Sequence, residues 1–293
     1  MMRFFRWLCA ALALAAFGYG GWRAGVWLHR RQVHRPPPVV TVTFLEVSSG
    51  DCTVIRTPDG HAIVIDAGGE ASGAQTADLL KQMGLAQIDL LVLASPADSS
   101  VGGVPALLQA NIPIQSVWLD GVANPGDEQT AAVAELQSRH VPVETVYKHE
   151  AKTVGVSPMV FQVVWPPRYG PRSTRDAMVC RLDYGGQSCL FLGPLTAASE
   201  PYLISGASAD DLRADVMQVT EHGEGEGSER ELLIRVQPEI AVISSTQQTP
   251  PDPAALERLQ SASADIWRTD QQGTLTVTLS LSTNAPVIKG SRS

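Results

Sequence analysis

The chain has 293 residues, of which 44% are hydrophobic and 18% are charged. This composition excludes a disordered protein, a small disulfide-rich domain and a transporter with many membrane spans. Residues 1–38 hold six of the 22 basic residues and no acid, so the remaining body carries 16 basic and 30 acidic groups, a net charge of −14. A body this acidic repels phosphates, which disfavours nucleic acid as a partner.

An apolar segment near the N-terminus predicts one transmembrane helix. The uncharged residues 7–22 are followed by Arg23 and a second apolar stretch, 24–28. Together they reach the length of a membrane span if the arginine extends to the interface. An uncleaved signal anchor is one interpretation, and a signal peptide cleaved near residues 13–16 is the other. Aromatic residues near the end of the run favour the anchor.

We therefore expect residues 1–38 to form a membrane anchor and a proline-rich spacer. The arginines on the two sides of the apolar run differ too little in number to fix its orientation. The expected location is the cytoplasmic (inner) membrane, crossed once, with the soluble body outside the cytoplasm.

The body opens with a predicted strand at 39–47, where β-branched residues alternate with other residues. Two more strands are predicted at 52–56 and 61–65, joined by the turn sequence Thr57-Pro58-Asp59-Gly60. Helical spacing and short apolar runs then predict further elements in chain order: a helix at 75–83, a strand at 88–93, a helix at 105–110, a strand at 116–119, a helix at 128–139, strands at 141–146 and 159–165, a hairpin at 178–192, a helix at 197–205, a strand at 214–219, a helix at 229–236, a strand at 240–244, a helix at 253–261 and strands at 265–268 and 274–281.

Hairpins dominate the first part of this order, and later strands alternate with helices. The order predicts an α/β (α+β) fold in which two sheets pack face to face with helices outside, a four-layer αββα sandwich. No linker divides residues 39–281, so we expect them to be one domain, followed by a C-terminal tail at 282–293.

Two of the four cysteines, Cys180 and Cys189, flank the turn of the predicted hairpin. If Tyr184 and Gly185 form a two-residue loop, the cysteines lie directly opposite each other, and a cross-strand disulfide follows in an oxidising compartment. The other interpretation is that both cysteines are small buried hydrophobic residues.

Several segments of the body, in order, resemble one known family. They are 42–69 (VTFLEVSSGDCTVIRTPDGHAIVIDAGG), 88–103 (IDLLVLASPADSSVGG), 181–193, 213–223, 241–244, 255–259 and 268–279. They resemble the metallo-β-lactamase-fold domain, and specifically the extracytoplasmic hydrolase-like domain of ComEC-type DNA-uptake (competence) proteins. The resemblance covers nearly all of residues 41–281. It implies the αββα fold and, in an intact relative, a dinuclear metal site.

The metal motif of that family reads Thr-His-Pro-Asp-Ala-Asp-His-x-Gly-Gly, and the matching stretch here, 94–103, is ASPADSSVGG. Ser95 and Ser100 stand in place of the two histidines, and Ala97 and Ser99 stand in place of the two aspartates. One carboxylate, Asp98, stands one position out of register. A serine hydroxyl is a poor metal ligand compared with imidazole or carboxylate.

The other metal-binding positions of the family are altered as well. Its bridging aspartate corresponds to Pro194, its His-His pair to Glu221 and His222, and its late His-Pro segment to 250–253, which has no histidine. Asp66 remains, in a place where the resemblance implies that it shapes the site. The resemblance thus predicts the rim of a degenerate site, with no catalytic residue and no cofactor.

Three functions remain open on the sequence. The first is a membrane-anchored, catalytically inactive protein that acts as a binding or scaffold subunit beside another envelope protein, linked to DNA uptake by resemblance alone. The second is a phosphodiesterase- or nuclease-like hydrolase with a rebuilt site, in which His222 and Glu221 form an acid/base pair or hold one Zn or Mn ion with Asp66 and Asp98. The third is a DNA-binding domain without catalysis.

Overall fold

The computed structural model describes residues 38–122, 125–155, 159–169 and 177–292, and Val39–Ser293 forms one compact unit. The expected anchor at residues 1–37 lies outside this described part of the chain. Among the described residues, no helix is both long enough and apolar enough to cross a membrane.

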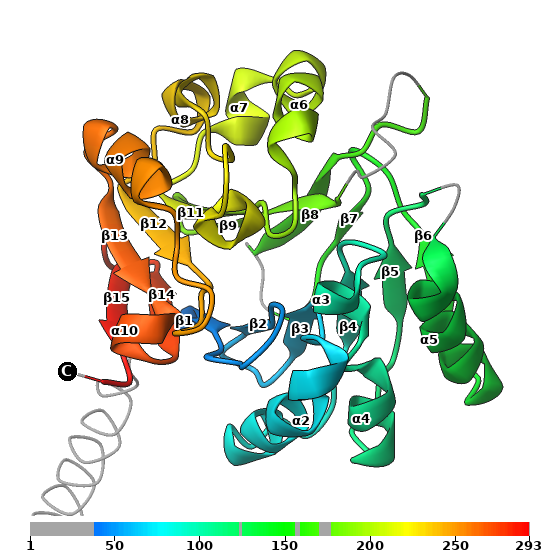
Figure 1. Cartoon of the computed structure of the whole chain (residues 1–293). Coiled ribbons are helices and arrows are strands. Elements are labelled where there is room, and N and C mark those ends of the chain that lie inside the picture. The colour runs from blue at the N-terminus through cyan, green and yellow to red at the C-terminus, as the bar shows by residue number, and fades with distance from the viewer. Residues whose placement is uncertain (1–37, 123–124, 156–158, 170–176, 293) are drawn as a thin grey trace, which may run out of the picture. The chain divides into compact units, whose positions relative to one another are not determined.

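Two mixed sheets form the inner layers of the unit (Figure 1). The eight-stranded sheet has the order β15-β14-β1-β2-β3-β4-β5-β6 and comprises β1 (Val39–Phe44), β2 (Thr53–Arg56), β3 (Ala62–Ile65), β4 (Leu90–Leu93), β5 (Val117–Leu119), β6 (Val143–Thr145), β14 (Leu275–Ser280) and β15 (Val287–Gly290). The seven-stranded sheet has the order β13-β12-β11-β10-β9-β8-β7 and comprises β7 (Ala151–Lys152), β8 (Val160–Trp165), β9 (Val179–Tyr184), β10 (Gln187–Phe191), β11 (Val216–Gln218), β12 (Ile240–Ile243) and β13 (Asp265–Arg268).

Each sheet combines antiparallel and parallel pairing in the same way. Strands β1, β2 and β3 pair antiparallel, and β3 to β6 then pair parallel. In the other sheet β8, β9 and β10 pair antiparallel, and β10 to β13 pair parallel. Parallel pairing needs crossover connections, which explains why helices separate the later strands of each half.

Helices cover the outer face of both sheets (Figure 1). The first sheet packs against α2, α4 and α5, and the second against α6 to α9, as the apolar clusters between them show. The helices of the described residues are η1 (Glu70–Ser72), α2 (Gly73–Gln82), α3 (Asp98–Val101), α4 (Val104–Gln109), α5 (Gly126–Ser138), η2 (Ala197–Ser199), α6 (Glu200–Gly206), α7 (Ala209–Leu212), η3 (Thr220–Gly223), α8 (Arg230–Val236), α9 (Pro253–Ser261) and α10 (Thr269–Gln272).

A third apolar cluster fills the space between the sheets. Phe44 of β1 and Phe191 of β10 meet across it with ring centroids 6.3 Å apart. In β3, Ile63 and Ile65 face this cluster while Val64 faces the helices, so the strand is apolar on both sides. The layers are therefore helix, sheet, sheet and helix, and the predicted two-sheet α/β arrangement is confirmed.

The C-terminal residues extend the first sheet beyond the expected domain boundary at residue 281. Residues 282–293 were expected to form a tail, but they contribute β15, which pairs antiparallel with β14. The sequence of this strand is too short to show a period of two, and its position at the sheet edge leaves it half exposed.

The hairpin of β9 and β10 has a different register from the one that the sequence suggested. Gly185 and Gly186 form its turn, with positive φ values of 63° and 80°, as a type I′ turn requires. Cys180 therefore lies opposite Phe191 rather than Cys189. The direct pairing that a Tyr184-Gly185 loop would give is absent. Both thiols are free and buried, in agreement with the other interpretation.

We expect Cys180 and Cys189 to resist alkylation in the folded chain and to react fully once the chain is unfolded. Burial raises the pKa of both thiols, so the reactive thiolate is scarce. Mass spectrometry of peptides labelled with iodoacetamide, with and without urea, measures this directly. Prior reduction should add no label to either peptide, and two labels that appear only after reduction would contradict the expectation.

Candidate functional site

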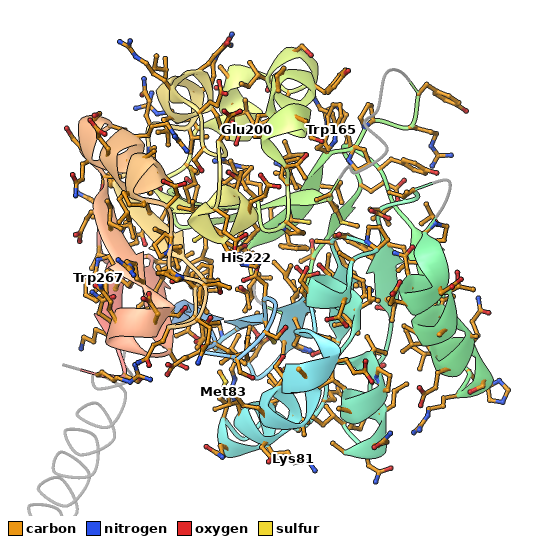
Figure 2. All side chains as sticks on the ribbon, in the orientation of Figure 1. Lys81, Met83, Trp165, Glu200, His222 and Trp267 are labelled. Carbon is orange, nitrogen blue, oxygen red and sulfur yellow. The ribbon has the colours of Figure 1, made fainter. Side chains whose placement is uncertain are left out.

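A cleft lies where parallel strands of both sheets end. Strands β3 and β4 of one sheet and β11 and β12 of the other finish beside it, and Figure 2 shows His222 near the centre of the view between the two halves. In sheets of this kind the carboxyl ends of strands are where ligands bind. The cleft has a volume of about 460 Å³ and is lined by Ser95, Pro96, Ala97, Ser99, Pro125, Gly126, Pro194, Thr196, Glu221, His222 and Glu224.

A buried ion pair lies beneath the cleft. Nδ1 of His222 is 3.5 Å from Oδ2 of Asp51 and 3.1 Å from the carbonyl oxygen of Ser244. The Asp51 side chain is 4% exposed and the His222 side chain 23%. The Asp51 carboxylate, more than any other group, raises the pKa of His222 to about 9. The imidazole is therefore protonated at neutral pH, with no lone pair for a metal ion or for accepting a proton.

The loop before β2 positions Asp51. Gly50 has a φ of +72°, and a Cβ there would lie 2.2 Å from the Ser99 carbonyl oxygen. The Asp51 backbone N–H donates to that same oxygen at 3.1 Å. Only glycine permits this approach, so the loop containing Ser99 and the loop containing Asp51 fold against each other.

The turn that carries His222 is strained. Glu221 and His222 have φ values of 45° and 57°, in the left-handed region that residues with a Cβ seldom adopt. The Glu221 N–H donates to the carbonyl of Gly193 at 3.0 Å, and Oε2 of its side chain accepts from the N–H of Ala197 at 3.1 Å. Glu221 is thus engaged by backbone, and the partner of His222 is Asp51.

Asp66 lies at the end of β3 and is 1% exposed. Burial raises its pKa to about 8, with a further contribution from Asp51, although the Ala94 N–H donates to Oδ1 at 2.8 Å and opposes the shift. The carboxyl group is therefore largely protonated at neutral pH. This environment favours the neutral acid. A protonated carboxyl is a weak metal ligand, so Asp66 is poorly suited to bind a metal ion.

Polar side chains between β4 and α4 accept hydrogen bonds from nearby backbone N–H groups. Oγ of Ser95 accepts from the N–H of Ala97 at 3.1 Å. Oδ1 of Asp98 accepts from the Glu70 N–H at 3.0 Å, so this carboxylate is directed to the start of η1. Ser100 is buried below the cleft. Of the sequence-predicted rim, Ser95, Ala97, Ser99, Pro194, Glu221 and His222 line the cleft, whereas Asp66, Asp98 and Ser100 do not.

Packing alone accounts for the glycine pair that ends the motif. A Cβ on Gly103 would lie 2.0 Å from the Ala67 carbonyl oxygen, and a Cβ on Gly102 would lie 2.0 Å from Oδ1 of Asp98. Either contact is impossible for a side chain without a shift of the backbone or of Asp98. These glycines are required by the fold whether or not a metal ion binds.

The residues at this site do not fit a dinuclear metal centre. Its remaining imidazole is protonated and paired, and Asp66 favours the neutral acid. In the part of the chain that the structure describes, no group of three or more histidine, cysteine, aspartate and glutamate side chains is arranged to hold a metal ion. Serine hydroxyls cannot replace the missing imidazole and carboxylate ligands.

Sequence reasoning missed Asp51 and Ser244, the two partners of His222. Asp51 stands within the resembling stretch 42–69, directly after Gly50 and before a strand, and that position was the available signal. Its burial depends on a contact with residue 99, which no local pattern reveals.

The chain matches no protein-family model. It is 28% identical over 124 residues to ComE operon protein 3 of Bacillus subtilis strain 168, a match that covers 41% of this chain and 16% of that protein. The chain therefore spans only a small part of this curated relative.

Solved structures show similarity in fold. CmlA, a diiron β-hydroxylase from Streptomyces venezuelae, has a TM-score of 0.54 and 13% identity, and its E377D mutant has a TM-score of 0.54 and 16% identity. Both comparisons cover 84% of this chain and 55% of the other. The metallo-β-lactamase-fold protein YhfI from Bacillus subtilis has a TM-score of 0.49 and 9% identity, covering 80% of this chain and 97% of that chain.

The chain has the four-layer αββα architecture that the resemblance to the metallo-β-lactamase fold predicts, and it shares its fold with CmlA. In sequence it resembles part of ComE operon protein 3, in agreement with the ComEC-like resemblance. Structural similarity at such low identity shows the fold alone, because one fold supports many functions.

We expect the free energy of unfolding to fall as the pH rises from 6.5 to about 9. The folded state raises the pKa of His222 from 6.5 to about 9, so its stabilising proton is fully bound below pH 6.5 and is lost through pH 9. The loss amounts to about 3 kcal/mol at about 1.4 kcal/mol per pKa unit. Urea unfolding at three pH values measures it.

Two variants separate the groups that cause this dependence. Asp66 also has a raised pKa, so it adds a loss of stability between pH 3.8 and about 8. His222→Gln should flatten the profile above pH 8, and Asp66→Asn should flatten it below pH 7 while leaving the upper part. A wild-type profile that is level between pH 6.5 and 9 would exclude the ion pair described here.

Asp51→Asn should destabilise the chain at pH 6 by about 3 kcal/mol, because it leaves a buried imidazolium without its counter-charge. The destabilisation should shrink toward pH 9.5, where His222 is neutral in both proteins. NMR titration should show the His222 pKa falling well below 9 in the variant. An unchanged pKa would mean that Asp51 is not the partner.

Proposed function

We propose that this chain is a metal-free, catalytically inactive protein of the metallo-β-lactamase fold that acts as a binding or scaffold subunit in the cell envelope. The observation that carries the proposal is the pairing of His222 with Asp51 and the Ser244 carbonyl. These contacts give the imidazole of His222 a structural role. The cleft rim, formed by residues 95–97 and 99 with Pro194, Glu221 and His222, is the proposed binding face.

The chemistry of the cleft supports binding over hydrolysis. A hydrolase of this fold depends on metal ions that lower the pKa of a bound water, and the donor set here does not suit such ions. A histidine that is already protonated at neutral pH cannot act as a general base. The volume of about 460 Å³ is sufficient for a short peptide segment or a small molecule.

The proposed location is the inner membrane, with residues 1–38 as the anchor and the body outside the cytoplasm. Similarity to ComE operon protein 3 supports a link to DNA uptake. The body, however, carries a net charge of −14, which opposes direct contact with DNA. We therefore propose that the partner is another envelope protein and that nucleic acid is bound elsewhere.

The second candidate is a metal-dependent hydrolase, phosphodiesterase- or nuclease-like, with a rebuilt site. Asp51, Asp66 and His222 lie close enough to influence one another's pKa, so they are the groups that a single metal ion would have to bind. In that case one Zn or Mn ion has to displace the proton of His222 and ionise Asp66.

Metal analysis of the full-length chain, purified in mild detergent, decides between the two. We expect well under one Zn, Mn or Fe per chain and no hydrolysis of bis-p-nitrophenyl phosphate when metal is added, because no unprotonated imidazole is available. The matched control is His222→Gln, which should behave as the wild type does in both assays. About one metal per chain, with turnover lost in His222→Gln, would establish the hydrolase instead.

The same preparation tests contact with DNA. We expect no shift of duplex or single-stranded DNA even at low salt, where electrostatic attraction is strongest. A shift that weakens steeply with added salt would instead support the DNA-binding interpretation.

A further inference from the structure

Residues of α8 and α9 line a second concave surface. Both helices belong to the outer layer over the second sheet (Figure 1). Its volume is about 750 Å³, larger than that of the cleft. The residues that matter for its chemistry are Arg230, Leu233, Ile234, Pro238, Glu257 and Arg258. We call this surface the α8/α9 groove.

Arg258 is positioned with one donor unused. Its Nη2 donates to the carbonyl oxygens of Gly227 at 2.7 Å and Gly225 at 3.1 Å, which fixes the guanidinium in place. Its Nε is buried and finds no acceptor among the described residues. The two hydrogen bonds from Nη2 therefore hold the guanidinium charge of Arg258 in a fixed position at the groove.

The groove is apolar as well as basic. Ile234 projects from α8 with 57% of its surface exposed, an unusual exposure for a large aliphatic residue on a helix that also packs inward through Leu233. Two arginines and one glutamate line the groove, giving a local net positive charge within a body of net charge −14. Apolar surface beside fixed positive charge is complementary to a segment with the opposite charge and a similar apolar face.

We infer that the α8/α9 groove docks an amphipathic, acidic segment of a partner protein. Apolar side chains at a spacing of three to four residues would cover Ile234, as in other grooves between helices. A carboxylate of the same segment would pair with the positive charges of Arg230 and Arg258 at the groove. This surface is separate from the cleft, so the inference goes beyond the function proposed above and does not depend on it.

Two other occupants are less complementary. A second copy of this chain brings a body with a net charge of −14, so two bodies repel each other overall. Nucleic acid offers phosphates to the arginines but gives Ile234 no apolar partner, and the same overall repulsion opposes it. Both are distinguishable outcomes of the experiment below.

The test uses the full-length chain and a fluorescein-labelled peptide of about 16 residues, long enough to form a helix on binding. The peptide carries leucine at positions i, i+3, i+4 and i+7 and glutamate on the flanks. One control peptide has lysine in place of every glutamate, and another has the acidic sequence scrambled. We expect saturable binding of the acidic amphipathic peptide, and binding at least tenfold weaker for both controls.

Variants locate the binding. Ile234→Asp and Arg230→Glu should each weaken binding tenfold or more, because each removes one half of the complementarity. Arg235→Glu is the matched control, since Arg235 is exposed on the same helix but does not line the groove, and it should change binding less than twofold. Circular dichroism melting checks that each variant is folded. Because Arg230 is exposed, Arg230→Glu is the substitution that disturbs packing least.

Three results would overturn the inference. The first is no binding of the acidic peptide at millimolar concentration. The second is binding that Ile234→Asp and Arg230→Glu leave unchanged. The third is self-association in sedimentation that Ile234→Asp abolishes while the peptide does not bind, which would assign the groove to a second copy of the chain. Metal content and hydrolysis do not enter these measurements, so they fail or succeed independently of the proposed function.

Discussion

The apolar layer between the two sheets is the constraint from which the cleft follows. It takes side chains from β1 to β4, β14 and most strands of the second sheet, so the space between the sheets has no room for unpaired polar groups. Polar residues enter only where strands end and loops from both sheets meet. There, Asp51 pairs with His222 and Asp66 accepts from Ala94. The cleft is therefore the place where the buried polar groups of the two sheets meet.

That pairing explains how the buried carboxylates at the strand ends are accommodated by groups of the chain itself. Buried carboxylates need a nearby positive charge or a proton, and here protons supply both: His222 becomes an imidazolium beside Asp51, and Asp66 favours the neutral acid. The close packing at Gly50 and Gly103 holds the surrounding loops together. Each of these features stabilises the fold directly, so none of them requires catalysis to explain its presence.

The sequence predicted most of the fold because long alternating or helical patterns identify individual elements. The strands at 39–44 and 275–280 and the helix at 253–261 lie within a few residues of their expected positions. Short elements such as β15 and α3 carry too few residues for a pattern. The register of the hairpin was predicted wrongly for another reason. Both Gly185 and Gly186 tolerate positive φ, and choosing the wrong pair of turn residues shifts every cross-strand partner.

The site was predictable in part for the same kind of reason. Resemblance placed Ser95, Pro194 and His222 around one cleft, because their positions follow from strand ends that the pattern identifies. The role of His222 could not be predicted from the sequence, because it depends on contacts with Asp51 and Ser244. These residues are 171 and 22 positions away in the chain. The protonation state of His222 is set by this tertiary contact and not by the residue type. The sequence position of a histidine therefore does not reveal its chemistry until its neighbours are known.

The cleft and the α8/α9 groove belong to different layers of the same sandwich. The cleft lies at strand ends, where loops from both sheets converge, and the groove lies between two helices on the outside of the second sheet. A segment bound in the groove would contact α8 and α9 without covering His222. Because α8 and α9 pack on the second sheet through a continuous apolar cluster, the groove keeps its shape without help from the cleft. A protein with two separate, chemically different surfaces is suited to hold two partners at once, which is the physical requirement for the scaffold role proposed here.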